Sequence, residues 1–299
     1  MSATVAGRRP RYRKGIVWKG EFRVLLVPPV YLTAVLLIAA TAAAGALKWW
    51  GGAAFGAQHP TVGALVEPAS ALRAAAWQSS TLGGLLLATV IVTIGGAQLI
   101  ESGTWGVLRL YENRSHVLYA RRLCAAVVFL AAVELVNGVT LWIVMRGMAA
   151  LRPTPTRPPT AFDTGTPALG VADAGSAGWA EALTATGGAL LTQTLYLSLG
   201  WCAAALLRNS IGALALGIGP WLVTAPLLIL PVGPFVPHAW IASLMSLPGE
   251  TQYRLYFWVQ AAPEPSPAVA AALVAGFAAA AAFLAQLLLR SERVLRPID

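Results

Sequence analysis

The most unusual chemical groups in this sequence are a carboxyl and an amide that lie inside a long apolar run. Glu134 is the only acidic residue well inside such a run, and Asn137 follows it three residues later, on the same face of a helix. An acid in the hydrocarbon is costly, by about 2.5–3.5 kcal/mol on insertion scales for the comparable Asp, and often functional. Glu134 and Asn137 are therefore candidates for lining a substrate path or carrying a proton. The alternative is a structural hydrogen bond to a neighbouring helix.

Sequence motifs of the common ATPases, hydrolases and metal enzymes are absent. The chain has no Gly-x-x-x-x-Gly-Lys-Ser/Thr phosphate loop, no His-Glu-x-x-His, no Gly-x-Ser-x-Gly and no Cys-x-x-Cys. Its histidines, His59, His116 and His238, stand far apart. We therefore predict no catalytic residue, no metal site and no cofactor in this chain, and not an enzyme. Any ATP-driven work requires ATP and Mg on another subunit.

The elements that must position these groups are membrane-spanning helices. Of 299 residues, 57% are hydrophobic and only 11% are charged, against about 25% charged in a soluble domain. Long runs without any charge exceed the ~18 residues that mark a spanning helix. We predict an all-α polytopic membrane protein with one transmembrane domain, 24–289, between a cytoplasmic N-terminal segment, 1–23, with an amphipathic interfacial helix and a cytoplasmic tail, 290–299. The six predicted spans are 24–47, 81–100, 123–145, 183–207, 211–231 and 266–289.

The basic residues predict the orientation of these spans. With both termini in the cytoplasm, that side holds fifteen of the 21 Lys and Arg residues: seven up to Arg23, four from Arg109 to Arg122, Arg208, and three after Leu289. Because cytoplasmic loops carry the excess of Lys and Arg, this pattern predicts a multi-pass protein of the cell (plasma) membrane with both ends inside. The segments after the first and third spans become long outward loops, and 230–267, rich in Pro and aromatic residues, suits short helices at the interface.

The inward segment 101–122 mixes charged and apolar residues at helical spacing, which suits a helix that docks into a groove on a partner protein. It begins with Glu, Gly-Thr and Leu, continues with an Arg, and ends with two basic residues that open the third span. These residues are Glu101, Gly103, Thr104, Leu108, Arg114, Arg121 and Arg122. In this pattern the chain resembles the permease subunits of ABC type-2 exporters, although Tyr111-Glu112-Asn113 replaces the family's usual Pro. The short turn at 206–215 and the order of the predicted elements are also similar.

The resemblance implies a transport function. It implies a permease that exports its substrate, works as a dimer with a second copy or a paralogue, and is energised by a separate nucleotide-binding ATPase subunit. The residues of 101–122 named above would be the coupling region that contacts this ATPase, and Glu101 is expected to pair with a basic residue of the same loop or of the partner. The resemblance leaves open the transported substrate and the choice between homodimer and heterodimer.

Two other functions fit the same composition. The chain could be a non-transporting membrane anchor or sensor whose basic inner loops recruit a partner, or a proton-coupled secondary transporter that uses Glu134. Its net charge of +9 does not indicate nucleic-acid binding, because Lys and Arg gather at the ends of apolar runs instead of forming a patch interleaved with aromatic residues. The lipid bilayer is the partner that every one of these functions requires.

Overall fold

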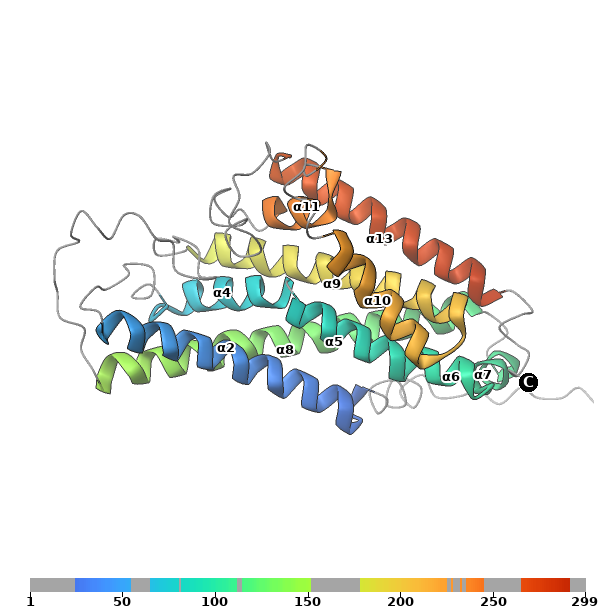
Figure 1. Cartoon of the computed structure of the whole chain (residues 1–299), viewed down its shortest axis with the longest axis horizontal. Helices are drawn as coiled ribbons and strands as arrows, with labels where there is room; N and C mark the ends of the chain where they lie inside the picture. Colours follow the sequence, from blue (N-terminus) through green and yellow to red (C-terminus); the bar gives the residue numbers. More distant parts are fainter. Residues whose placement is uncertain are drawn as a thin grey trace, which may run out of the picture.

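The computed structural model is a bundle of long helices that run side by side (Figure 1). It describes residues 25–54, 65–80, 82–111, 115–151, 178–224, 227, 232, 235–244 and 265–290. The main elements are α2 (Pro28–Ala54), α4 (Pro68–Ser80), α5 (Leu82–Val92), α8 (Ser115–Leu151), α9 (Trp179–Leu207), α10 (Ser210–Thr224), α11 (Pro237–Leu244) and α13 (Pro267–Arg290). Every element in the described ranges is helical, which confirms the predicted all-α fold. The predicted amphipathic helix in 1–23 and the tail after Arg290 lie outside these ranges.

Five of the described helices are long and apolar enough to cross a bilayer. They are Pro28–Ala46, Gly83–Glu101, His116–Leu151, Trp179–Leu207 and Pro267–Arg290. The remaining predicted span, 211–231, corresponds to α10, which is helical for 15 residues. A helix of that length reaches about 22 Å, whereas the hydrocarbon core is ~30 Å thick. The structure therefore gives five candidate spans, and a sixth stays a prediction.

The segment between the first two spans contains a helix that the sequence analysis assigned to an outward loop. This helix, α4, has nine buried residues among its 13 and packs against α8 and α9. Pro68 stands at its first position, where a missing backbone N–H costs nothing, and an alanine-rich stretch follows. Arg73 of α4 forms a salt bridge with Glu181 of α9 at 3.2 Å. The predicted loop is therefore partly wrong, because part of it belongs to the bundle.

Helix α13 buries small and branched apolar residues and exposes large ones on its other faces. The face of α13 that packs on α9 repeats every three or four residues, as Ala270, Val274, Ala278, Ala281, Ala285 and Leu289. Such small residues let two helices approach closely in a membrane. On other faces of α13, Phe277 and Phe283 are exposed. Large apolar side chains on the outer faces of α13 are consistent with a bundle that lipid surrounds.

The second candidate span is not a regular α-helix. After α5 the chain forms a π-helical turn, η1 (Thr93–Ala97), and then continues as α6 (Gln98–Glu101). The short helix α7 (Thr104–Tyr111) follows, and Figure 1 shows it nearly end-on, so that it runs across the bundle axis. In the predicted outer loop 230–267, α11 packs on α13, which confirms one short helix there.

Candidate functional site

The turn between α6 and α7 explains the Gly-Thr pair of the predicted coupling region. Gly103 has a φ of 70°, a left-handed conformation that favours glycine, and a Cβ there would meet no atom within 4 Å. Glycine is therefore needed for backbone conformation and not for space. The hydroxyl of Thr104 lies 2.8 Å from that of Ser102, across the same turn. Together these residues change the chain direction from along the bundle to across it.

Glu101 connects this turn to the turn between α9 and α10. Its carboxylate accepts hydrogen bonds from the backbone N–H of Ser210, at 3.1 Å, and from the Ser210 hydroxyl. Because Ser210 is the first residue of α10, the negative charge of Glu101 lies at the positive end of that helix. Asn209 caps the same helix, accepting a hydrogen bond from the N–H of Gly212 at 2.5 Å. The α6–α7 turn and the α9–α10 turn are thus joined by a carboxylate whose partner lies 109 positions further along the chain.

Arg109 connects α7 to the last turn of α13. Its Nη1 donates to the carbonyl oxygens of Leu289 and Arg290, both at 3.4 Å. The last carbonyls of a helix have no partner within the helix, and a basic side chain there also interacts favourably with the helix dipole. The start of α10 and the end of α13 are therefore both tied to the α6–α7 segment.

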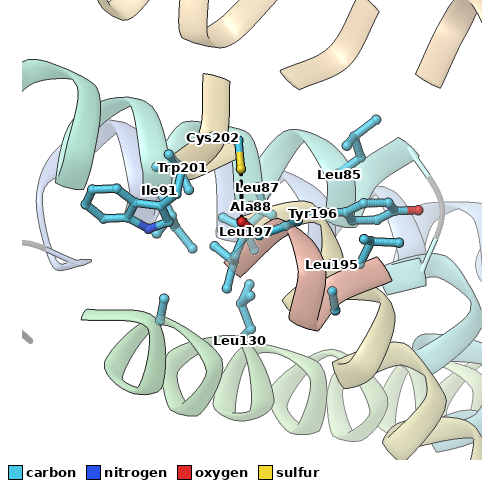
Figure 2. Packing of buried hydrophobic residues seen from close by; sticks show 14 of the residues in the cluster. Leu85, Leu87, Ala88, Ile91, Leu130, Leu195, Tyr196, Leu197, Trp201 and Cys202 are labelled. Atoms are coloured by element: carbon cyan, nitrogen blue, oxygen red, sulfur yellow. Dashed lines mark hydrogen bonds between the residues drawn. The ribbon is translucent and has the colours of Figure 1, made fainter. Parts of the chain in front are cut away.

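An aromatic cluster anchors α7 to the interior of the bundle. Trp105 of α7 is fully buried, and its ring centroid lies 5.5 Å from that of Trp201 in α9. Tyr119 of α8 meets Trp201 edge-on at 5.6 Å. Gly96 of η1 makes room for the indole, since a Cβ there would lie 2.8 Å from two of its ring carbons. Figure 2 shows Trp201 in the apolar interior together with Ile91 of α5.

Arg122 stabilises the irregular turn η1. Its Nη1 donates to the carbonyl oxygen of Gly95 at 2.7 Å. In a π-helical turn the regular i→i−4 ladder is interrupted, so a charged donor at this carbonyl supports the bulge. Arg122 also borders a cavity of about 20 Å³ between the start of the first span, α8 and Trp201, a volume that suits one water molecule.

The structure brings most residues of the predicted coupling region to the same end of the bundle. Glu101, Gly103 and Thr104 form the α6–α7 turn, and Leu108 packs against the core from α7. Arg121 and Arg122 lie near the start of α8, whereas Arg114 lies outside the described residues.

The expected pairing of Glu101 with a basic residue is not seen in the described part of the chain, where the carboxylate bonds to Ser210. Sequence reasoning missed this partner. Asn209-Ser210, a capping sequence directly before an apolar run, was the local signal that a helix begins there.

Glu134 and Asn137 lie in the interior of the bundle, 0% and 1% exposed. Both carboxyl oxygens and both amide atoms lack a hydrogen-bond partner among the described residues. A buried polar group that lacks a partner costs about 1–3 kcal/mol, so this pair is expensive. Its predicted place in a substrate path stays a prediction, since the surrounding helices enclose both side chains in this structure.

The other end of the bundle holds a buried histidine. The ring of His238 in α11 stacks on Trp221 of α10, with centroids 3.7 Å apart, and Tyr196 meets Trp221 edge-on at 5.0 Å. Burial, to 4% exposure, lowers the pKa of His238 from 6.5 to about 4. The imidazole is thus neutral at physiological pH, which suits a ring packed between apolar groups.

Comparisons with known proteins add no relative: no family model, no curated protein and no solved structure matches this chain. Among the described residues, no group of three or more His, Cys, Asp or Glu side chains could hold a metal ion. The candidate site is therefore defined by its geometry, in which hydrogen bonds join the α6–α7 segment to the start of α10 and to the end of α13.

Proposed function

We propose that this chain is the membrane-spanning permease subunit of an ATP-binding cassette exporter, energised by a separate ATPase subunit. The observation that carries the proposal is the set of bonds around the α6–α7 turn. Glu101 binds the first residue of α10, Arg109 binds the last carbonyls of α13, and Trp105 is buried against α9. A force applied to α7 would therefore reach α9 and α13 directly, and α10 through the α6–α7 turn.

This arrangement suits the transmission of a movement from a partner protein. The side chain of Val107 on α7 is 51% exposed, while Trp105 on the same helix is buried. An ATPase that docks on the exposed side and closes around ATP would move α7, and the bonds to α10 and α13 would carry the movement into the bundle as rigid levers. The chain itself would need no nucleotide site. The second permease copy or paralogue, the plasma membrane and the cytoplasmic position of α7 and both termini belong to the same proposal.

The test is copurification of the full chain, from its native membranes in mild detergent, with identification of bound proteins by mass spectrometry. We expect an ATPase with a phosphate loop. The Val107→Asp variant places a charge on the exposed side of α7 and should lose this partner. Leu151→Asp is the matched control and should retain the ATPase. Leu151 is 84% exposed and is the last residue of α8, whose first residues follow α7.

Three outcomes contradict the proposal. One is a wild-type chain that copurifies with no such ATPase. Another is equal retention of the ATPase by the Val107→Asp and Leu151→Asp variants. The third is a regulatory protein without a phosphate loop as the sole partner, which would favour the membrane anchor or sensor.

A further inference from the structure

Two buried polar side chains lie at the centre of α8, and their role does not depend on the proposed docking of an ATPase. Glu134 and Asn137 stand three residues apart on one face of this helix, and Leu130, one turn before Glu134, is also fully buried. Figure 2 shows Leu130 turned from α8 towards the apolar interior, near Leu197 and Leu195 of α9. Because Leu130 and Glu134 are four residues apart, the carboxyl projects into the same interior.

Glu134 lies midway between the charges that flank the apolar part of α8. Arg122 and Arg146 are each 12 residues away, which is about 18 Å along an α-helix. The carboxyl is therefore centred in a stretch of about 36 Å between the two arginines, long enough to cross the ~30 Å hydrocarbon core. Water is not available at that depth to solvate a charge, so neutralisation must come from another group.

The part of α4 that packs on α8 near Gly138 carries buried apolar side chains. Leu72 of α4 contacts the backbone of α8 at Gly138, where a Cβ would lie 2.9 Å from the Leu72 side chain. One turn along α4 from Leu72, Ala75 and Ala76 are fully buried. On α9, the Thr186 hydroxyl lies near the Glu134 carboxyl, but it donates its hydrogen bond to the Ala182 carbonyl oxygen at 2.9 Å.

No charged side chain of the packed helices neutralises Glu134 in the described part of the chain. The helices that pack against α8 are α2, α4, α9 and α13. Arg73 of α4 and Glu181 of α9 pair with each other at 3.2 Å, and Arg290 ends α13 far from its centre. Tyr31 of α2 is 57% exposed. The titratable groups on these faces therefore leave the carboxyl without a counter-charge.

We propose that Glu134 and Asn137 form a binding site for one small monovalent cation, a proton or Na⁺, inside the membrane-spanning bundle. Two carboxylate oxygens and one amide oxygen are hard ligands, which hard cations prefer. One carboxylate neutralises one positive charge, so a divalent ion would leave a net charge in the hydrocarbon. A proton bound to the carboxyl or Na⁺ bound by the three oxygens neutralises the site equally.

The experiment uses the full chain in nanodiscs of zwitterionic lipid and measures its unfolding temperature by intrinsic fluorescence. One arm replaces choline chloride with NaCl at constant ionic strength and pH. The other arm varies pH through neutrality in the absence of Na⁺. The variants are Glu134→Gln, which keeps the shape but not the charge, and Asn137→Leu, which removes the amide oxygen. Glu181→Gln is the matched control, since it removes an exposed carboxyl of the same chain.

A saturable rise of the unfolding temperature with Na⁺, absent in Glu134→Gln and Asn137→Leu but present in Glu181→Gln, supports a sodium site. A fall of the unfolding temperature as pH rises, absent in Glu134→Gln but present in Glu181→Gln, supports a proton site. A wild-type chain that responds to neither cation overturns the proposal, and so does a response that Glu134→Gln retains. The wild-type result can overturn the proposal even when a variant fails to fold.

Discussion

The indole of Trp201 leaves no room for a side chain on Gly96, so Gly96→Ala should weaken the bundle. The added Cβ would lie 2.8 Å from two ring carbons, and Trp201 cannot move away because Trp105 and Tyr119 pack against it. Overpacking of this kind costs about 1–3 kcal/mol. Gly187→Ala is the matched control: Gly187 also lies within a helix, but a Cβ there would meet nothing within 4 Å.

The two variants are compared by thermal unfolding of the purified chain in the same detergent. Both replace a helical glycine by alanine, so the change in helix propensity is similar and the difference between them isolates the steric cost. We expect the free energy of unfolding of Gly96→Ala to be about 1–3 kcal/mol lower than that of Gly187→Ala. Equal free energies of unfolding for the two variants would refute the conclusion that a glycine is needed at position 96 to leave room for Trp201.

Three further predictions concern single residues. Gly103→Ala should reduce the free energy of unfolding by about 1–2 kcal/mol, because φ is 70° there and alanine disfavours that conformation. Gly103→Asn should reduce the free energy of unfolding by less. Equal free energies of unfolding for the two variants would contradict the backbone explanation. Asn209→Ala removes the cap on the Gly212 N–H and should cost about 0.5–2 kcal/mol, while Asn209→Ser retains most of the stability in the same unfolding assay. The pKa of His238 is about 4 in the folded protein and near 6.5 when unfolded, so only the unfolded state binds a proton between these values. Stability should therefore fall as pH drops from about 6.5 to 4, and His238→Phe should flatten this dependence; an unchanged pH profile in the variant would exclude the histidine as its source.

The candidate spans were predictable because each depends on a local property of the chain. A run of apolar residues with charges only at its ends has few alternatives to a membrane helix, wherever its neighbours lie. The segment that forms α4 lacks this property, since it contains Arg73, Gln78 and several serines. Its helix is buried by contacts with α8 and α9, which no local pattern reveals. Of the predicted span 211–231, the structure describes α10 as far as Thr224, and most of 225–231 lies outside the described residues.

The sequence indicated which residues of the predicted coupling region to consider, but it did not indicate which residues they contact. Gly103, noted in the sequence only as part of a Gly-Thr pair, has a left-handed conformation in the α6–α7 turn. The bond from Glu101 to Ser210 joins residues 109 positions apart, and the bonds from Arg109 to the end of α13 span 180 positions or more. Such contacts depend on how helices are arranged in three dimensions. The burial of Trp105 likewise depends on its packing against Trp201, which lies 96 positions further along the chain.

The most direct test of the central claim is photocrosslinking from α7 in intact cells. A photoreactive amino acid at Val107, on the exposed side of α7, should yield an adduct with an ATPase that contains a phosphate loop, identified by mass spectrometry. The same probe at Val128, on the exposed middle of α8 where lipid should surround it, should yield no ATPase adduct. Absence of the ATPase adduct at Val107, or equal adducts at both positions, would contradict the proposal that α7 is the docking site of an ATP-hydrolysing subunit.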